Sequence, residues 1–193
     1  MKRLFLTYTA VAFIAVSCNK KAEMKVSEQT EVSKDTLNAA SDETLYANNK
    51  PFSEITLNKE FEDVNGNNIT FRDLIGKHKG KPIVIDVWAS WCPDCIKGFP
   101  ELKELQKKYP ETAYVFLSLD RSKDKWIAAI EKYDLKGEHY YLDETMKGEF
   151  GTSITLDWIP RYIIADPQGN IALEKAIVAD DALLIQTLDK LQP

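Results

Sequence analysis

Hydrophobic positions in this chain follow two different periods after residue 50. Two runs, 83–90 and 113–120, are apolar at nearly every position, as strands covered on both faces are. Each run is followed by a stretch with apolar residues at helical spacing, 93–108 and 123–133. The alternation of buried strand and amphipathic helix predicts an α/β domain.

Turn-forming residues divide the rest of this region into shorter elements. Asn65-Gly66-Asn67 predicts a β-hairpin over 61–71, and Pro167-Gln168-Gly169 predicts another between 161–166 and 170–178. The other expected elements are a helical turn at 72–75, a short edge strand at 139–142, a helix at 145–150 closed by Gly151, and a last helix capped by Asp180 or Asp181. The expected fold is a central mixed β-sheet flanked by helices, with an N-terminal β-hairpin extension.

The amino-terminal residues have the three regions of a secretory signal. Lys2 and Arg3 precede a mostly apolar run over 4–16, which at about 1.5 Å per residue is too short to cross a hydrocarbon core of about 30 Å. Ala15-Val16-Ser17-Cys18 resembles a bacterial lipobox, with alanine where leucine is usual. We expect residues 1–17 to be a signal peptide removed before Cys18, which then carries a lipid; the alternative is ordinary cleavage at the same bond.

Residues 18–50 are rich in Lys, Glu, Ser, Thr and Asn and show no sustained apolar period. Such a segment buries too little surface to order itself, so we expect a flexible tether; the alternative is a docking helix over 32–46. The folded domain is expected at 51–193. The net charge of -5 and the absence of a Lys/Arg cluster argue against nucleic acid and anionic membrane surfaces as partners of that domain.

Two of the three cysteines, Cys92 and Cys95, lie where the first buried strand gives way to a helix. The first turn of a helix has free N–H groups and a partial positive charge, which favour the thiolate of Cys92, and Pro93 suits the first helical position. Cys95 lies three positions further on, on the same side of the helix, so the two sulfurs can bridge. This arrangement fits thiol–disulfide exchange, in which an exposed Cys92 attacks and Cys95 releases the product.

Two other uses of the cysteine pair stay open at this point. A permanent structural disulfide would stabilise little, because the loop that it closes is short. A zinc half-site would need two further ligands, and His78 and His139, which we expect at the surface, show no ligand spacing.

The region from Pro51 to the C-terminus resembles the thioredoxin superfamily and, within it, the membrane-tethered TlpA/ResA-like thiol-disulfide oxidoreductases. The likeness is most specific at WASWCPDC, residues 88–95. The other matching residues are Asn65-Gly66-Asn67, Gly80-Lys81-Pro82, Ile85-Asp86-Val87, Pro100-Glu101-Leu102, Ile159-Pro160-Arg161-Tyr162-Ile163-Ile164-Ala165-Asp166 and Gly169. The resemblance implies a thioredoxin-like fold and a redox-active cysteine pair, and we expect no cofactor.

Further site residues follow from this resemblance. Asp86 stands where thioredoxins keep a buried acid beneath the second cysteine, and its apolar neighbours also predict burial and a raised pKa. We expect Asp86 to deprotonate Cys95 during product release. Pro160 matches the cis-proline that faces the cysteine pair, which makes Ile159 a substrate-contacting residue and Trp91 an apolar rim.

Other positions match less closely or depart from the family pattern. Pro100 matches a kink in the family's helix. Gly98 stands where relatives often carry glutamate, and glycine inside a helix is unfavourable by about 1 kcal/mol relative to alanine. The connection over 152–158 is longer than usual and is expected to form a rim on the substrate face. The residues expected in that rim are Leu156, Asp157 and Trp158.

Asp94, between the two cysteines, bears on the direction of the reaction. A carboxylate about 6 Å from Cys92 should disfavour its thiolate by roughly 1 kcal/mol. We therefore expect a reductant, with a potential nearer to thioredoxin's value of about -270 mV than to the value of about -120 mV for the strong oxidant DsbA.

The favoured function is thus reduction of disulfides in exported proteins by a protein lipid-anchored to a bacterial membrane, on its periplasmic or extracytoplasmic face. The family suggests apocytochrome c as one client. Because such a compartment is oxidising, a membrane electron donor has to restore the dithiol. The alternatives are a thiol peroxidase of the peroxiredoxin type, whose activating arginine is absent around Cys92, and a non-catalytic metal-delivery or redox-sensing module.

Overall fold

The computed structural model of the protein describes residues 50–192. The predicted signal peptide, the lipidation site at Cys18 and the tether up to residue 49 lie outside the described residues. Within 50–192, no helix is both long enough and apolar enough to span a bilayer.

Strands and helices alternate along the described part of the chain, as the apolar pattern predicts. The helices are α2 (Glu54–Leu57), α3 (Phe71–Gly76), α4 (Pro93–Lys97), α5 (Phe99–Lys108), α6 (Lys123–Tyr133), α7 (Glu149–Ser153) and α8 (Ala182–Leu191). The strands are β1 (Glu60–Asp63), β2 (Asn68–Thr70), β3 (Ile83–Trp88), β4 (Ala113–Ser118), β5 (Glu138–Tyr141), β6 (Arg161–Ala165) and β7 (Ile171–Ala176).

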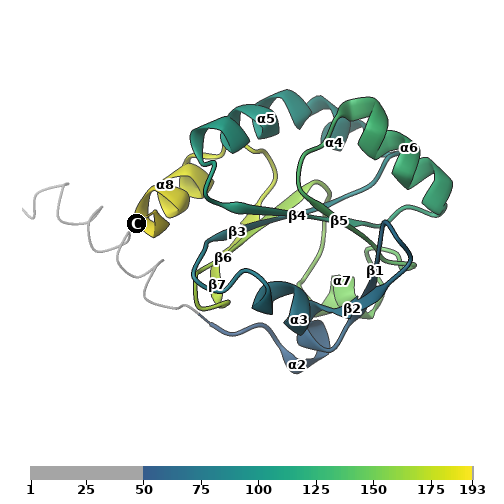
Figure 1. The fold of residues 1–193 in the computed structure, drawn as a ribbon, viewed down its shortest axis with the longest axis horizontal. Helices are drawn as coiled ribbons and strands as arrows, with labels where there is room; N and C mark the ends of the chain where they lie inside the picture. Colours follow the sequence, from purple (N-terminus) through teal and green to yellow (C-terminus); the bar gives the residue numbers. More distant parts are fainter. Residues whose placement is uncertain (1–49, 193) are drawn as a thin grey trace, which may run out of the picture.

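One mixed sheet contains these strands, in the order β2-β1-β5-β4-β3-β6-β7. β3, β4 and β5 pair in parallel, and the other neighbours pair antiparallel. Helices α4, α5, α6 and α8 lie on one side of the sheet, and α2, α3 and α7 lie on the other (Figure 1). The expected mixed sheet flanked by helices, with an N-terminal hairpin β1–β2, is confirmed.

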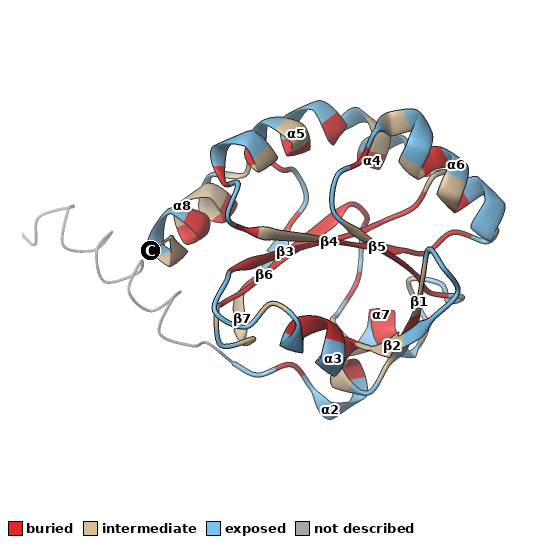
Figure 2. Ribbon diagram, in the orientation of Figure 1, coloured by how far each residue is buried: buried red, intermediate tan, exposed pale blue. Residues whose placement is uncertain are grey.

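β3 forms the centre of the hydrophobic core. All of its residues are buried, as are most of those in β6 and β4 beside it (Figure 2). The Trp88 ring packs edge-on against Phe99 of α5, with the ring centroids 5.6 Å apart. Because side chains alternate along a strand, Val84 and Asp86 face the same helical layer as Trp88. The carboxyl end of β3 leads directly to the cysteine pair.

β5 is not the edge strand that the sequence suggested. β1 pairs with its outer side, with Glu62 opposite Tyr141, while β4 pairs with the other side. His139, expected at the surface, is also buried, and its ring stacks on Phe116 of β4 at 4.6 Å. Its Nε2 lies 3.1 Å from the carbonyl oxygen of Leu135, and burial lowers the pKa of the imidazole. Its neighbours are Phe116, opposite it on β4, and the Leu135 carbonyl, so packing against these groups accounts for its burial.

The structure tests two predicted helix boundaries, the end of a helix at Gly151 and the start of the last helix at Asp180 or Asp181. The helix expected over 145–150 begins later, as α7, and Gly151 lies inside it rather than after it. A Cβ on Gly151 would overlap the backbone carbonyl of Met146, so a close backbone approach requires this glycine. Asp181, one of the two expected caps, begins α8 by accepting the N–H groups of Leu183 at 2.8 Å and Leu184 at 3.1 Å.

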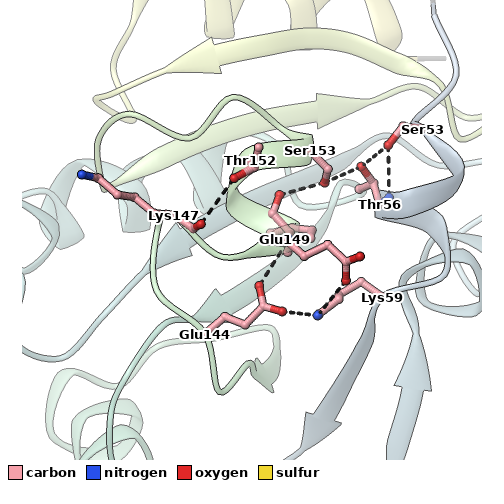
Figure 3. A network of polar contacts seen from close by, with 9 residues as sticks. Ser53, Thr56, Lys59, Glu144, Lys147, Glu149, Thr152 and Ser153 are labelled. Atoms are coloured by element: carbon pink, nitrogen blue, oxygen red, sulfur yellow. Dashed lines mark hydrogen bonds and ion pairs between the residues drawn. The ribbon is translucent and has the colours of Figure 1, made fainter.

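The amino-terminal part of the described chain is fastened to α7 by polar contacts (Figure 3). The Thr56 hydroxyl of α2 lies 2.9 Å from the Ser153 hydroxyl of α7. Lys59 forms ion pairs with Glu144 and Glu149, which flank the start of α7. These contacts hold α2 and β1 against the segment that precedes β6, so this stretch packs as part of the domain.

Candidate active site

The cysteine pair follows β3 and begins α4. Cys92 and Cys95 form a disulfide, with their Cα atoms 5.3 Å apart. Cys92 is the N-cap of α4, and its Sγ accepts the N–H of Cys95 at 3.1 Å. Pro93 lies in the first turn, where a missing N–H costs no intrahelical hydrogen bond. The helix therefore begins where the sequence predicted.

The prediction of one helix over 93–108 is wrong, because α4 and α5 are separate helices that meet at Gly98. Pro100 accordingly lies in the first turn of α5 and does not kink a continuous helix. Because α4 has only 5 residues, its dipole is small. The main stabilisation of negative charge on the Cys92 sulfur is therefore the hydrogen bond from the Cys95 N–H. A Cβ on Gly98 would make ordinary contacts, the nearest at 3.5 Å, so packing does not explain this glycine.

The disulfide lies beneath the surface rather than on it. Cys92 is 3% exposed and Cys95 1%, so the expected exposure of Cys92 is wrong for this oxidised form. The carbonyl oxygen of Ile159 lies 3.5 Å from Cys92 Sγ and covers it. The Ile159–Pro160 peptide bond is cis, as the resemblance implies, and both residues are buried. Trp91, next to Cys92 in the chain, is 50% exposed.

Asp86 lies on the face of β3 that packs against the helical layer containing Cys95. The residue is buried, and neither carboxyl oxygen has a hydrogen-bond partner among the described residues. This burial raises the pKa of Asp86 to about 8, because the charged form loses its hydration. The predicted burial is confirmed, and with this raised pKa Asp86 can hold or accept a proton close to neutral pH.

Tyr162 is a neighbour of this acid that sequence reasoning missed. It lies opposite Asp86 on β6, and its hydroxyl is buried without a hydrogen-bond partner in the described structure. Burial, together with the charge of Asp86, raises its pKa well above the usual value. The hydroxyl would lie 3.9 Å from a Cβ on Gly98, which places it under the junction of α4 and α5. The available signal was a tyrosine hydroxyl within the buried strand that follows Pro160.

The connection over 152–158 is held in place by a buried arginine, Arg161, which sequence reasoning also missed. Arg161 is 1% exposed, pairs with Asp157 and donates to the Thr155 carbonyl. Leu156, expected in the rim, is buried in the core, whereas Trp158 is 53% exposed. Trp158 lines a groove of about 320 Å³ between α4, α5 and the segment before α8. The other groove residues include Asp94, Gly98, Glu101, Val178 and Asp180.

Metal ligation finds no support in the described residues. Among residues 50–192, no three His, Cys, Asp or Glu side chains are grouped so that they could hold a metal ion. His78 is only partly exposed and lies 3.2 Å from Glu138, and His139 is buried in the sheet. The arrangement of the cysteine pair is instead suited to reversible disulfide formation.

Comparison with known proteins identifies relatives that have this chemistry. The model of a family described as "Thioredoxin-like" matches residues 80–171. A thiol-disulfide oxidoreductase ResA from Bacillus cereus is 33% identical over 76 residues, which cover 38% of this chain and 42% of that protein. The thiol:disulfide interchange protein DsbE from Haemophilus influenzae is 27% identical over 139 residues, 72% of this chain and 71% of that protein. The match thus spans less than half of the ResA relative.

A solved structure extends this likeness over the domain. The solution structure of a candidate thiol-disulfide oxidoreductase from Bacteroides vulgatus has 31% sequence identity and a TM-score of 0.57. The alignment covers 68% of this chain and 84% of that one. The chain therefore belongs to the thioredoxin-like thiol-disulfide oxidoreductases of the ResA/DsbE (TlpA-like) group.

Proposed function

We propose that the protein reduces disulfides of exported proteins through the Cys92–Cys95 pair. The observation that carries the proposal is the bond between the two sulfurs at the first turn of α4, next to the Ile159–Pro160 bond. This disulfide is the product state that the reaction would leave on the protein. Family membership supports the same chemistry.

In the proposed first step, the Cys92 thiolate attacks one sulfur of a client disulfide. The client's other sulfur leaves as a thiolate and takes up a proton, and a mixed disulfide joins Cys92 to the client. The Cys95 N–H, 3.1 Å from Cys92 Sγ, donates toward the sulfur and stabilises its negative charge. The Ile159 carbonyl, 3.5 Å from Cys92 Sγ in the disulfide form, would accept the S–H of a protonated Cys92 in the dithiol form.

In the proposed second step, Cys95 attacks the Cys92 sulfur and displaces the client. Cys95 is 1% exposed, so its proton needs a nearby acceptor, and Asp86 is the proposed one. With a pKa of about 8, the carboxylate form of Asp86 is present in about one molecule in ten at pH 7. The step passes two electrons to the client, which leaves as a dithiol while the protein regains its Cys92–Cys95 disulfide.

The residues between the cysteines are proposed to tune the equilibrium. Asp94 is in the first turn of α4 and exposed, so its charge opposes the Cys92 thiolate and favours the disulfide form of the protein. Pro93 withholds one N–H from the sulfur at the same turn. Both effects destabilise the dithiol form relative to the disulfide form, so the dithiol gives up its electrons more readily. This is the direction proposed for the protein, which is to reduce client disulfides.

Client contacts are proposed at the exposed rim around the pair. Trp91 and Trp158 are 50% and 53% exposed, and they are the chain neighbours of Cys92 and Ile159, whose sulfur and carbonyl meet at the pair. The backbone of Ile159 would pair with an extended client segment, and the two indole rings would contact its apolar side chains.

Export and anchoring are proposed from the amino-terminal sequence. Residues 1–17 would be a signal peptide, Cys18 the lipid-bearing residue, 18–50 a tether and 51–193 the catalytic domain. The lipid would hold the protein at the extracytoplasmic face of a bacterial membrane. A membrane electron donor would restore the dithiol, and apocytochrome c is one proposed client.

Insulin reduction with dithiothreitol tests the activity. We expect the wild type to accelerate insulin precipitation, Cys92→Ser to abolish the acceleration, and Cys18→Ser, the matched change outside the pair, to leave it intact. Cys95→Ala should instead accumulate mixed disulfides, which would identify clients in cells. A Cys92→Ser protein as active as the wild type would show that the pair is not the redox centre.

A further inference from the structure

A buried carboxylate ties the loop before Cys92 to the neighbouring strand. Asp120 follows β4 and is 2% exposed. Its Oδ2 accepts the Ser90 N–H at 2.9 Å, and its Oδ1 accepts the Ser90 hydroxyl at 2.6 Å. The Ser118 hydroxyl also donates to Oδ2, at 2.9 Å, and in turn accepts the Asp120 N–H at 3.1 Å. Both oxygens receive only N–H or O–H donors, which matches an ionised carboxylate.

The tied residue lies two positions before the attacking cysteine. Backbone bonds hold the same loop at its two ends: the Leu119 N–H donates to the Trp88 carbonyl at 2.9 Å, and the Cys92 N–H donates to the Ala89 carbonyl at 3.1 Å. Ser90, between these bonds, is fixed through both its backbone and its side chain by Asp120. The chain that leads into α4 is therefore held by a carboxylate from the segment that follows β4.

We infer that Asp120 is a positioning residue that holds the Ser90–Cys92 loop in the geometry of the disulfide and thereby sets the redox equilibrium of the cysteine pair. The inference rests on the proposed redox function of that pair. Asp120 does not contact either sulfur in the structure; it acts through Ser90. Nothing in the sequence pattern singled it out, because the acid simply ends an apolar strand.

Two physical effects of this contact have the same sign. The two hydrogen bonds from Ser90 to Asp120, called the clamp below, restrict the loop. Breaking the disulfide therefore gains less conformational freedom than it would in an unrestrained loop. The buried negative charge also opposes a thiolate forming on Cys92, two residues from Ser90. Each effect favours the disulfide over the dithiol, so loss of the clamp should raise the reduction potential.

A glutathione redox titration of the full exported protein measures this effect. Reduction of the pair takes two glutathione thiols and yields two protein thiols and glutathione disulfide, so the equilibrium constant reports the relative stability of the two forms. We expect Asp120→Asn to shift that constant about tenfold toward the dithiol, which corresponds to about 30 mV. Ser90→Ala, which removes one donor from the clamp, should shift it in the same direction by about threefold.

Asp124→Asn is the matched control, since Asp124 is an exposed acid in the first turn of α6. It should leave the constant unchanged. A merely structural role of Asp120 would lower the stability of the disulfide and dithiol forms equally and leave the potential unmoved. The double variant Asp120→Asn/Ser90→Ala should shift the constant no further than Asp120→Asn alone, because both changes break the same contact.

The outcomes separate this inference from the proposed function. If Asp120→Asn and Ser90→Ala both stay within twofold of the wild-type constant, or shift it toward the disulfide, the inference is overturned. Should Asp120→Asn fail to fold, Ser90→Ala decides alone. If instead the wild type reduces no protein disulfide, the proposed function fails, while the potentials of the variants still test the clamp.

Discussion

Asp86→Asn is the substitution for which the structure allows the most direct calculation. The wild-type carboxyl is buried without a hydrogen-bond partner in the described structure, and its pKa rises from 3.8 to about 8. The folded protein therefore keeps this proton up to about pH 8, whereas the unfolded chain releases it near pH 4. Stability is consequently full below the unfolded pKa and is lost as the pH rises through this window.

The size of this pH effect on the free energy of unfolding follows from the single proton that Asp86 binds. Between the two pKa values, the unfolded state binds one proton fewer, so the free energy of unfolding falls by about 1.4 kcal/mol per pH unit. From pH 5 to pH 7, Asp86 alone should reduce the stability of the oxidised wild type by about 3 kcal/mol. Asparagine has no charge to bury, so the variant should lack this decline.

Urea denaturation of both oxidised proteins at pH 5, 6 and 7 measures the difference. The stability of Asp86→Asn relative to the wild type should increase steadily with pH. A constant difference across the series would refute the raised pKa, and with it the physical basis for Asp86 as a proton acceptor. In stopped-flow assays, Asp86→Asn should also slow client release without abolishing the first attack; unchanged turnover between pH 6 and 8 would remove Asp86 from the mechanism.

Three further predictions concern redox direction, client binding and anchoring. The reduction potential of the wild type should lie below about -180 mV, and a higher value would contradict the assignment as a reductant. Asp94→His should raise the potential by about 30 mV or more, because the change removes a negative charge beside Cys92. Trp158→Ala should raise KM for a protein disulfide several-fold and leave reaction with a small aromatic disulfide unchanged, since a polypeptide bound at Cys92 can extend into the groove that Trp158 lines. Equal effects on both substrates would argue against a contact role. Cells given a radioactive fatty acid should label the wild type and not Cys18→Ser, and an unlabelled wild type would contradict the anchor.

Local patterns in the sequence determined much of the fold and the central chemistry. The apolar runs at 83–90 and 113–120 became β3 and β4, because a strand covered on both faces is apolar at most positions. The same reasoning predicted the burial of Asp86, whose immediate neighbours are all apolar. The cysteine spacing and Pro93 located the start of α4, since capping and helix geometry act over three or four residues.

Contacts between distant segments decided the rest. Whether β5 is an edge strand depends on the hairpin that pairs with it, and the burial of His139 depends on Phe116 of β4, which lies opposite it. Cys92 is covered by a carbonyl 67 positions further along the chain, and Ser90 is held by a carboxylate 30 positions away. Periodicity and spacing report only on neighbours along the chain, whereas burial of a sulfur or the path of a loop depends on which strands lie side by side in the sheet.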